Sequence, residues 1–331
     1  MSNAIRGSSG APFSRLLSVA GRRGSRVVDN AEMCTMIDSS DEWIQQRTGI
    51  IERRWIGEGE DIHSLAHDAA DLAIQRAGVP RDDIDAVIVA SVSTPRRFPS
   101  LAAELSYELG LTDAAAFDMQ AACAGFCYAT AQADAMIRCG TARHVLVIGA
   151  DVLSTQVDIT DRTTAFLFGD GAGAAVVGPA EEPGIGPVVW GSNGGQADVI
   201  WTEHWSDVLA TGQRPVIHMA GSKVFLWATT LIADKAAEAI AKAGLTPDDL
   251  DVFIPHQANN RITDSMLRRL HLPSNVVVSR DIQHMGNSSA ASIPLAMDAL
   301  LSGGQAASGD NALIIGFGAG LVYAGQVVKL P

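Results

Sequence analysis

The chain has 331 residues, of which 47% are hydrophobic and 18% are charged. This balance predicts a folded protein with a sizeable core and excludes a largely disordered chain. The net charge of -13 argues against a nucleic-acid partner, because binding to phosphates needs a positive surface. No apolar run approaches the roughly 20 residues that a membrane-spanning helix needs, so no membrane association is expected.

The first ten residues, MSNAIRGSSG, have the composition of an expression leader and a flexible segment, so residues 1–10 are excluded from the predicted fold. The cysteines are Cys34, Cys123, Cys127 and Cys139. So few cysteines in a long, core-rich chain predict a reducing, cytoplasmic location rather than a disulfide framework. Their spacing also lacks the paired pattern of a zinc site, so no metal is expected.

Two stretches of the chain repeat the same pattern. Residues 69–88 read AADLAIQRAGVPRDDIDAVI, and residues 235–254 read KAAEAIAKAGLTPDDLDVFI. Each predicts a helix that ends at a glycine, a turn with Pro and Asp, and then a buried strand. A shift of 166 aligns Gly78 with Gly244.

The repeat predicts two related α/β halves, at residues 11–180 and 190–331. Helices that alternate with apolar, β-branched strands favour sheets covered on both faces. Residues 181–213 lie between the halves and are predicted to be an irregular connection and lid.

A second pair of similar segments follows the first. AACAGFCYATAQADAMIRCG runs into HVLVIGAD, and HMGNSSAASIPLAMDALLSGG runs into NALIIGFG. A shift of 164 aligns Asp134 with Asp298 and Cys123 with Asn287. His256 comes directly after the predicted strand VFIP. Because ligands of α/β folds gather at the carboxyl ends of strands, a pseudo-twofold axis would bring these three loops to one site.

Cys123 precedes an Ala-rich predicted helix, and its small neighbours leave the sulfur accessible. A thiol at a helix N-terminus lies near the positive end of the dipole, which favours the thiolate. A buried apolar cysteine is the alternative, and it is the interpretation for Cys34, Cys127 and Cys139. The place of Cys123 in the repeat favours a nucleophile.

His256 lies in the polar segment IPHQANNRI, and Asn287 lies in HMGNSSAAS. A structural histidine and a helix cap are the alternatives for these two residues. If both face one site, they can donate hydrogen bonds to a developing enolate oxygen. The Gly-rich stretches 169–173 and 316–320 are interpreted as close-approach turns, because neither precedes a helix as a nucleotide-binding loop would.

Seven motifs together resemble those of the β-ketoacyl-acyl carrier protein synthase III family, acyltransferases that initiate type II fatty acid synthesis. The motifs are SSDEWIQQRTGI, AFDMQAACAGF, DRTTAFLFGDGAGAAVV, HMAGSKVF, PHQANNRI, GNSSAAS and GFGAGL, and the likeness covers nearly the whole chain from about Arg15. The resemblance implies an α/β fold of the duplicated thiolase type, with five layers αβαβα, in a homodimer.

The resemblance also implies a ping-pong reaction without a cofactor. Cys123 would take an acyl group from acyl-CoA, a substrate, and malonyl-acyl carrier protein would then lose carbon dioxide and attack the acyl group. His256 and Asn287 would assist the decarboxylation. The backbone N–H groups of Cys123 and Ala319 would form the oxyanion hole.

Further binding residues follow from the same resemblance. Trp43 and Arg162 would enclose the adenine of CoA. Other CoA contacts would be Ser39, Arg47, Thr48, Gly221 and Ser222. Phe98 would reach the acyl pocket across the dimer interface, where its bulk favours a short or branched primer if it points inward.

The resemblance places the docking of the acidic carrier protein at Gln257, Arg261, Arg268 and Arg269. Such a local basic patch suits an acidic partner, whereas a solvated helix face is the alternative for Arg268 and Arg269. Leu226 stands where the family often has a lysine, which leaves the identity of the carrier partner open.

Two other activities fit the same scaffold. One is a ketosynthase III-like acyltransferase of secondary metabolism, and the other is a catalytically silent subunit of a condensing heterodimer. The presence of Cys123, His256 and Asn287 favours condensation. Thiolase chemistry is disfavoured because GFGAGL lacks the second cysteine that it uses.

Overall fold

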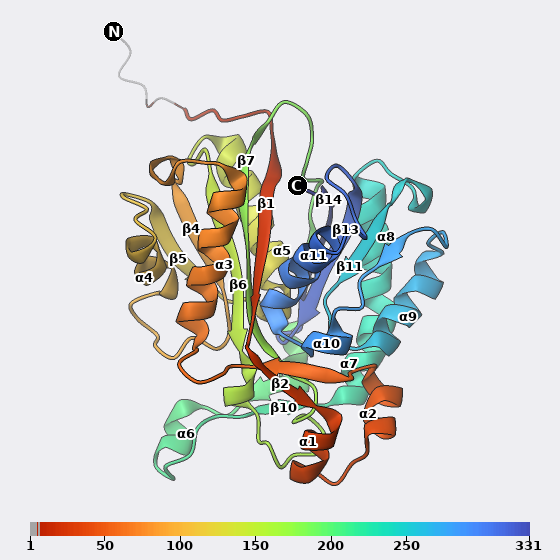
Figure 1. Cartoon of the computed structure of the whole chain (residues 1–331). Coiled ribbons are helices and arrows are strands. Elements are labelled where there is room, and N and C mark those ends of the chain that lie inside the picture. The colour runs from red at the N-terminus through yellow and green to blue at the C-terminus, as the bar shows by residue number, and fades with distance from the viewer. Residues whose placement is uncertain (1–4, 6) are drawn as a thin grey trace.

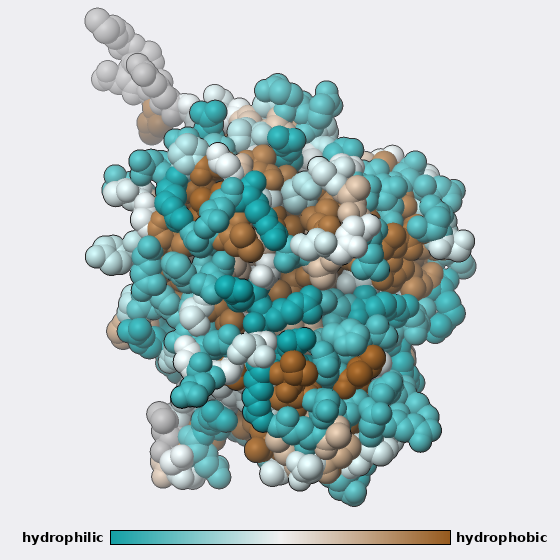
Figure 2. Space-filling model, viewed as in Figure 1, coloured by the Kyte–Doolittle hydropathy of each residue, from teal (hydrophilic) through white to brown (hydrophobic). Residues whose placement is uncertain are grey.

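Two five-stranded mixed sheets stand side by side, with helices between them and on both outer faces (Figure 1). The structure is a computed structural model that describes residue 5 and residues 7–331. Of the predicted leader, residues 1–4 and 6 lie outside the described residues. The face drawn in Figure 2 is largely hydrophilic, with apolar patches between the charged side chains.

The first sheet has the strand order β1-β7-β6-β4-β5. Strands β4, β5 and β6 are parallel, and β1 and β7 run antiparallel to their neighbours. Its helices are α3 and α4 on the outer face and α5 on the inner face. The bounds are β1 (Phe13–Arg23), α3 (Ile62–Ala77), β4 (Ala86–Ala90), α4 (Leu101–Glu108), β5 (Ala115–Met119), α5 (Gly125–Cys139), β6 (Val145–Val152) and β7 (Asp170–Ala180).

The second sheet repeats this arrangement strand for strand, in the order β8-β14-β13-β11-β12. Strands β11, β12 and β13 are parallel, and β14 and β8 are antiparallel to their neighbours. Helices α8 and α9 cover the outer face, and α11 covers the inner face. The bounds are β8 (Val189–Ser192), α8 (Ala233–Lys242), β11 (Val252–Pro255), α9 (Asn260–Leu270), β12 (Val277–Val278), α11 (Ser292–Ser302), β13 (Asn311–Gly318) and β14 (Val322–Lys329).

The remaining elements gather at one end of the two sheets (Figure 1). They include two small antiparallel pairs, β2 with β3 and β9 with β10. Their bounds are β2 (Arg26–Asp29), α1 (Asn30–Met36), α2 (Asp41–Thr48), β3 (Glu52–Trp55), β9 (Ile200–Thr202), α6 (Trp205–Leu209), β10 (Ile217–Met219), α7 (Gly221–Trp227) and α10 (Ile282–Met285). The segment 181–213 therefore has more regular structure than predicted, because β8 extends the second sheet and β9 pairs with β10.

Strand β6 shows how the layers arise. Val145 and Val147 pack in the cluster that contains α5 and α11, whereas Leu146 and Ile148 pack in the cluster that contains α3. Side chains alternate across a strand, so a strand that is apolar at every position needs a helix on each face. The predicted five-layered αβαβα architecture is confirmed.

The first repeat has the predicted local structure in both halves. Helix α3 ends at Gly78, whose φ of +64° is left-handed, and Gly244 follows α8 with a φ of +75°. These angles suit glycine because it has no Cβ to clash with the backbone. A short 3-10 turn and a buried strand follow each glycine, as the pattern predicts.

The predicted alignment of Cys123 with Asn287 is wrong by three residues. Ala122 begins the 3-10 turn η2 (Ala122–Ala124), and Ser289 begins the equivalent turn η7 (Ser289–Ala291). Both have a positive φ, 45° and 50°, so the structural shift is 167 and Cys123 pairs with Ala290. Because α5 has 15 residues and α11 has 11, a shift taken from the middle of the helices fails at their N-terminal ends.

A core substitution tests the packing of the central layer. Ile314 lies on β13 and is fully buried against the central helices. We expect Ile314→Ala to lower the free energy of unfolding by about 2–5 kcal/mol, through lost burial and a residual cavity. Chemical denaturation measures this change. The control is Leu226→Ala, at a side chain that is 65% exposed, for which we expect less than about 0.5 kcal/mol.

Candidate active site

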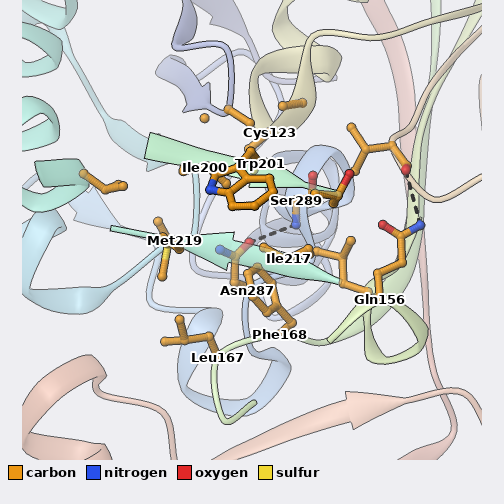
Figure 3. A pocket seen from close by; sticks show the side chains of 18 of the residues that line it. Cys123, Gln156, Leu167, Phe168, Ile200, Trp201, Ile217, Met219, Asn287 and Ser289 are labelled. Carbon is orange, nitrogen blue, oxygen red and sulfur yellow. Dashed lines mark hydrogen bonds between the residues drawn. The ribbon is translucent and has the colours of Figure 1, made fainter. Parts of the chain in front are cut away.

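A cavity of about 1320 Å³ opens where the carboxyl ends of the parallel strands of both sheets meet. Cys123, His256 and Asn287 all line it, although they come from three loops that are far apart in the sequence. Figure 3 shows Cys123 and Asn287 in its wall, with strands β9 and β10 across it. The predicted convergence of the three residues on one cavity is therefore present in the structure.

The Cys123 turn lies directly against the end of β13. A Cβ at Gly318 would lie 3.0 Å from the Cys123 Sγ atom and 3.1 Å from its backbone N. A Cβ at Gly316 would lie 2.7 Å from the Cα of Ala124. The second Gly-rich stretch is thus a close approach, as predicted, but its first part is strand rather than turn.

The resting Cys123 side chain is a thiol. Burial raises the pKa of Cys123 to about 12, while the Ser289 hydroxyl opposes this rise in pKa and the charge of Asp151 adds to it. The prediction of a thiolate favoured by the helix dipole is therefore wrong for the resting protein, because desolvation outweighs it. The proton of Cys123 has to leave as the sulfur reacts.

His256 follows β11, and its backbone N–H donates to the Ile315 carbonyl. Its Nδ1 lies 2.7 Å from the Ser292 hydroxyl oxygen, and that oxygen accepts the Gln257 N–H at 3.4 Å. The Ser292 hydroxyl can donate its own proton to Nδ1, and in that arrangement the ring proton is on Nε2. Burial lowers the pKa of His256 to about 3, so the imidazole is neutral.

The Asn287 backbone is held on both sides by the segment before β7. Its N–H donates to the Leu167 carbonyl, and its carbonyl accepts the Gly169 N–H. Its Oδ1 accepts the Ser289 N–H at 2.9 Å (Figure 3). The carboxamide is thus oriented with Oδ1 engaged, which leaves the Nδ2 donor for the cavity.

Ser289 and Ser292 were not selected from the sequence, although they orient the two predicted hydrogen-bond donors. Both are almost fully buried, at 1% exposure. The motif GNSSAAS contains both serines, and its polar residues are equally compatible with a helix cap. Their partners are set by tertiary contacts, so the sequence alone does not separate an orienting serine from a capping one.

Most of the predicted CoA residues line the cavity. Trp43, Arg47 and Thr48 come from α2, and Gly221 and Ser222 from the start of α7. The guanidinium carbons of Arg47 and Arg162 lie 5.5 and 5.9 Å from the Trp43 ring centre. Two predicted CoA residues do not belong to the lining: Arg162, and Ser39, which is half-buried.

The predicted docking residues divide into two groups. Arg261, Arg268 and Arg269 are exposed on α9. Arg261 lines the cavity and lies over the Phe225 ring, 5.2 Å from its centre.

Gln257 is only 2% exposed, and its amide is used inside the protein. Its Nε2 donates to the Pro255 carbonyl at 2.7 Å, and its Oε1 accepts the Ile282 N–H at 3.1 Å. The Gln257 side chain is therefore unable to contact a docked partner.

Phe98 lies outside the cavity lining and is 83% exposed. The cysteines are free, and of the three expected to be buried only Cys127 is; Cys34 is half-buried and Cys139 is exposed. Among the residues that the structure describes, there is no cluster of three or more His, Cys, Asp or Glu suited to a metal ion. Within the same described part, no helix combines the length and apolarity needed to cross a bilayer.

The duplicated αβαβα fold with Cys, His and Asn in one cavity defines a condensing enzyme of the thiolase type. The family model for 3-oxoacyl-[acyl-carrier-protein] synthase III matches residues 117–194, and the model for its C-terminal part matches residues 240–330. The chain belongs to the 3-oxoacyl-[acyl-carrier-protein] synthase III family.

Individual relatives support this assignment over the full length. The chain is 51% identical to the β-ketoacyl-[acyl-carrier-protein] synthase III of Streptomyces glaucescens, over 99% of both chains. Among solved structures, it is similar to the priming β-ketosynthase of the R1128 polyketide pathway, with 44% identity, a TM-score of 0.96 and 99% coverage of both chains. The synthase III of Thermus thermophilus shares 40% identity, with a TM-score of 0.90, 96% coverage of this chain and 99% of that chain.

Removal of the free space beside the nucleophile tests the contact at the end of β13. We expect Gly318→Ala to slow alkylation of Cys123 by iodoacetamide at least about tenfold, because the new Cβ overlaps the sulfur. The readout is the alkylation rate by peptide mass spectrometry. Gly194→Ala is the control, since a Cβ there meets nothing within 4 Å; equal rates in both variants would contradict the close approach.

The raised pKa of Cys123 predicts a specific pH dependence. Below its pKa the thiolate fraction grows with pH, so alkylation should accelerate about tenfold per pH unit between about pH 6 and 9, without a plateau. Alkylation rates at Cys123 across this range measure it, with Cys123→Ala as the blank. A plateau near neutral pH would show that the thiolate is already formed in the resting protein.

Proposed function

We propose that the chain catalyses the decarboxylative condensation of an acyl-CoA primer with malonyl-acyl carrier protein, giving 3-oxoacyl-acyl carrier protein, CoA and carbon dioxide. The observation that carries this proposal is the shared cavity of a thiol, a neutral imidazole and an oriented carboxamide at Cys123, His256 and Asn287. In this reaction acyl-CoA is a substrate and no separate cofactor takes part.

In the first half-reaction, the Cys123 sulfur attacks the thioester carbonyl of the acyl-CoA. The new carbon–sulfur bond forms, the bond to the CoA sulfur breaks, and the thiol proton ends on CoA. The tetrahedral oxyanion would lie against the backbone N–H groups of Cys123 and Ala319. Gly318 supports this placement, because it leaves space beside the Cys123 N–H where any side chain would intrude.

In the second half-reaction, the malonyl group loses carbon dioxide and its electron pair moves onto the thioester oxygen. The His256 Nε2–H and the Asn287 Nδ2–H would donate to that oxygen. The carbanion then attacks the acyl carbonyl on Cys123, the bond from that carbonyl to the sulfur breaks, and the thiolate takes up a proton from solvent. A neutral His256 suits this step, because a positive charge would pair with the malonyl carboxylate and retain it.

Both substrates would enter along one side of the cavity. Trp43 and Arg162 would hold the adenine between them. The Arg162 guanidinium carbon now lies 5.9 Å from the Trp43 ring centre, so the two side chains would have to move apart. Arg47 lies beside them for the phosphates. Arg261, Arg268 and Arg269 form the proposed docking surface for the acidic carrier protein, and Gln257 has no place in it.

We further propose a homodimer in which Phe98 completes the acyl pocket of the other subunit. The exposure of Phe98 in the single chain supports this, because a large exposed aromatic side chain is typical of a contact surface. A bulky ring in that position would favour short or branched primers.

A priming role in polyketide synthesis is the second candidate function. The similarity to the R1128 priming ketosynthase favours it, as does Leu226, which is exposed where the family often has a lysine. Both functions use the same chemistry and differ in the carrier protein. Condensation rates with a fatty-acid carrier and with a polyketide carrier distinguish them.

Single substitutions separate the two half-reactions. We expect Cys123→Ala to abolish acylation by acyl-CoA. We expect His256→Ala and Asn287→Ala to retain acylation but to lower carbon dioxide release by about 10²–10³-fold, because each removes a donor to the enolate oxygen. Radiolabelled acyl transfer and carbon dioxide capture measure the two steps. Full carbon dioxide release by both variants would rule out the proposed roles.

A further inference from the structure

The two 3-10 turns at the site are related by the repeat, and each contacts the opposite half. Turn η2 packs against β13, and turn η7 packs against β6. A Cβ at Gly316 would lie 2.9 Å from the Cys123 carbonyl oxygen, and a Cβ at Gly149 would lie 2.4 Å from the Ala290 carbonyl oxygen. Each turn therefore approaches a glycine of the facing strand. The two glycines, Gly149 and Gly316, are 167 residues apart and so occupy equivalent positions in the repeat.

Two residues further along each strand, the halves differ in chemistry. In the second half, Gly318 leaves space beside the Cys123 N–H. In the first half, the equivalent position is Asp151, and its Oδ2 accepts the Ala290 N–H at 3.2 Å. A protein carboxylate thus occupies the place that corresponds, in the other half, to the proposed oxyanion site.

Asp151 is fully buried and is joined to the loop after β4 through its other oxygen. Its Oδ1 accepts the Ser91 hydroxyl at 3.1 Å, the Val92 N–H at 2.9 Å and the Ser93 hydroxyl at 2.8 Å. A carboxylate buried this deeply is costly unless its oxygens are occupied by donors. The reaction steps proposed above do not use it.

Successive N–H groups of η7 link Asp151 to the reacting groups. The Ser289 N–H donates to Asn287 Oδ1, and the next one, of Ala290, donates to Asp151 Oδ2. The Asp151 contact therefore fixes the turn that orients the Asn287 carboxamide.

We propose that Asp151 fills the first half's counterpart of the oxyanion hole and acts as a positioning residue, holding η7 so that Asn287 presents its Nδ2–H to the enolate. This inference rests on the proposed function, in which Asn287 stabilises that enolate. It also explains why the duplicated fold has one reactive turn: the second turn has its N–H occupied by the protein itself.

Asp151 has a second effect at the site: it favours the decarboxylation step by holding Asn287, but its charge disfavours the Cys123 thiolate. Its charge adds to the rise that burial causes in the pKa of Cys123. Burial also raises the pKa of Asp151 itself, and the Ser289 hydroxyl opposes the rise at both groups. His256 lines the same cavity and is neutral, so it adds no charge of its own. Loss of the Asp151 charge should therefore make Cys123 more acidic while it releases η7.

Asp151→Asn tests both effects at once. The amide oxygen keeps the three donors from the loop after β4, but its Nδ2–H now faces the Ala290 N–H. We expect carbon dioxide release to fall at least about tenfold, from loss of one charged hydrogen bond. The pH profile of Cys123 alkylation should shift to lower pH. General structural damage would instead slow both reactions.

Asp85→Asn is the matched control. Asp85 Oδ2 accepts the N–H groups of Arg143 and His144, which directly precede β6. Asp151 lies near the other end of β6. Asp85→Asn should leave carbon dioxide release and the alkylation profile unchanged. Undiminished carbon dioxide release in Asp151→Asn, or equal losses in both reactions, would overturn the inference.

A backbone change covers the case in which Asp151→Asn does not fold. Incorporation of lactate in place of Ala290 converts the amide to an ester and deletes only that N–H. Carbon dioxide release should fall, whereas the pH dependence of Cys123 alkylation should stay unchanged because the Asp151 charge is retained. Unchanged carbon dioxide release would overturn the inference. Absence of carbon dioxide release in the unmodified protein contradicts the proposed function instead, so the two failures are distinguishable.

Discussion

The whole site depends on the contact between the Cys123 turn and the end of β13. A turn from the first half reaches a strand of the second half, and it fits only because Gly316 and Gly318 have no side chains. This contact sets the position of the nucleophile relative to His256, since β11 and β13 are neighbours in one sheet. It also leaves space beside the Cys123 N–H for an oxygen of the substrate.

The duplication divides the chemistry between the two halves of the fold. One half supplies the thiol, and the other supplies the imidazole and the carboxamide. Burial would be costly for these polar groups without partners. The imidazole and the carboxamide each have one: the Ser292 hydroxyl orients His256, and the Ser289 N–H orients Asn287. The polar atoms left unengaged are those that face the cavity, which is how a preorganised site lowers a barrier without rearrangement.

Much of this architecture could be predicted from local patterns. The glycine-terminated helices and the doubly buried strands follow from periodicity and from the repeat, because those features are set by neighbours in sequence. The five layers follow from the family resemblance. The three cavity residues were also found in this way, although the alignment that suggested Cys123 and Asn287 was wrong by three residues. Helices α5 and α11 differ in length, and a gap inside a helix leaves no signal in a single sequence.

The features that could not be predicted depend on tertiary contacts. The protonation of Cys123 follows from burial that outweighs the helix dipole, and Gln257 is removed from the surface by its bond to the Ile282 N–H. Ser39 lies next to α2, yet outside the cavity wall. In each case the residue type is compatible with the expected role, but the surrounding tertiary packing determines the actual protonation state or position.

A crystal structure of the protein acylated by its acyl-CoA primer tests the proposed geometry most directly. The acyl group should be bonded to the Cys123 sulfur, with its carbonyl oxygen within hydrogen-bonding distance of the Cys123 and Ala319 N–H groups, about 2.7–3.2 Å. An acyl group on another residue, or a carbonyl oxygen directed away from both N–H groups, would contradict it.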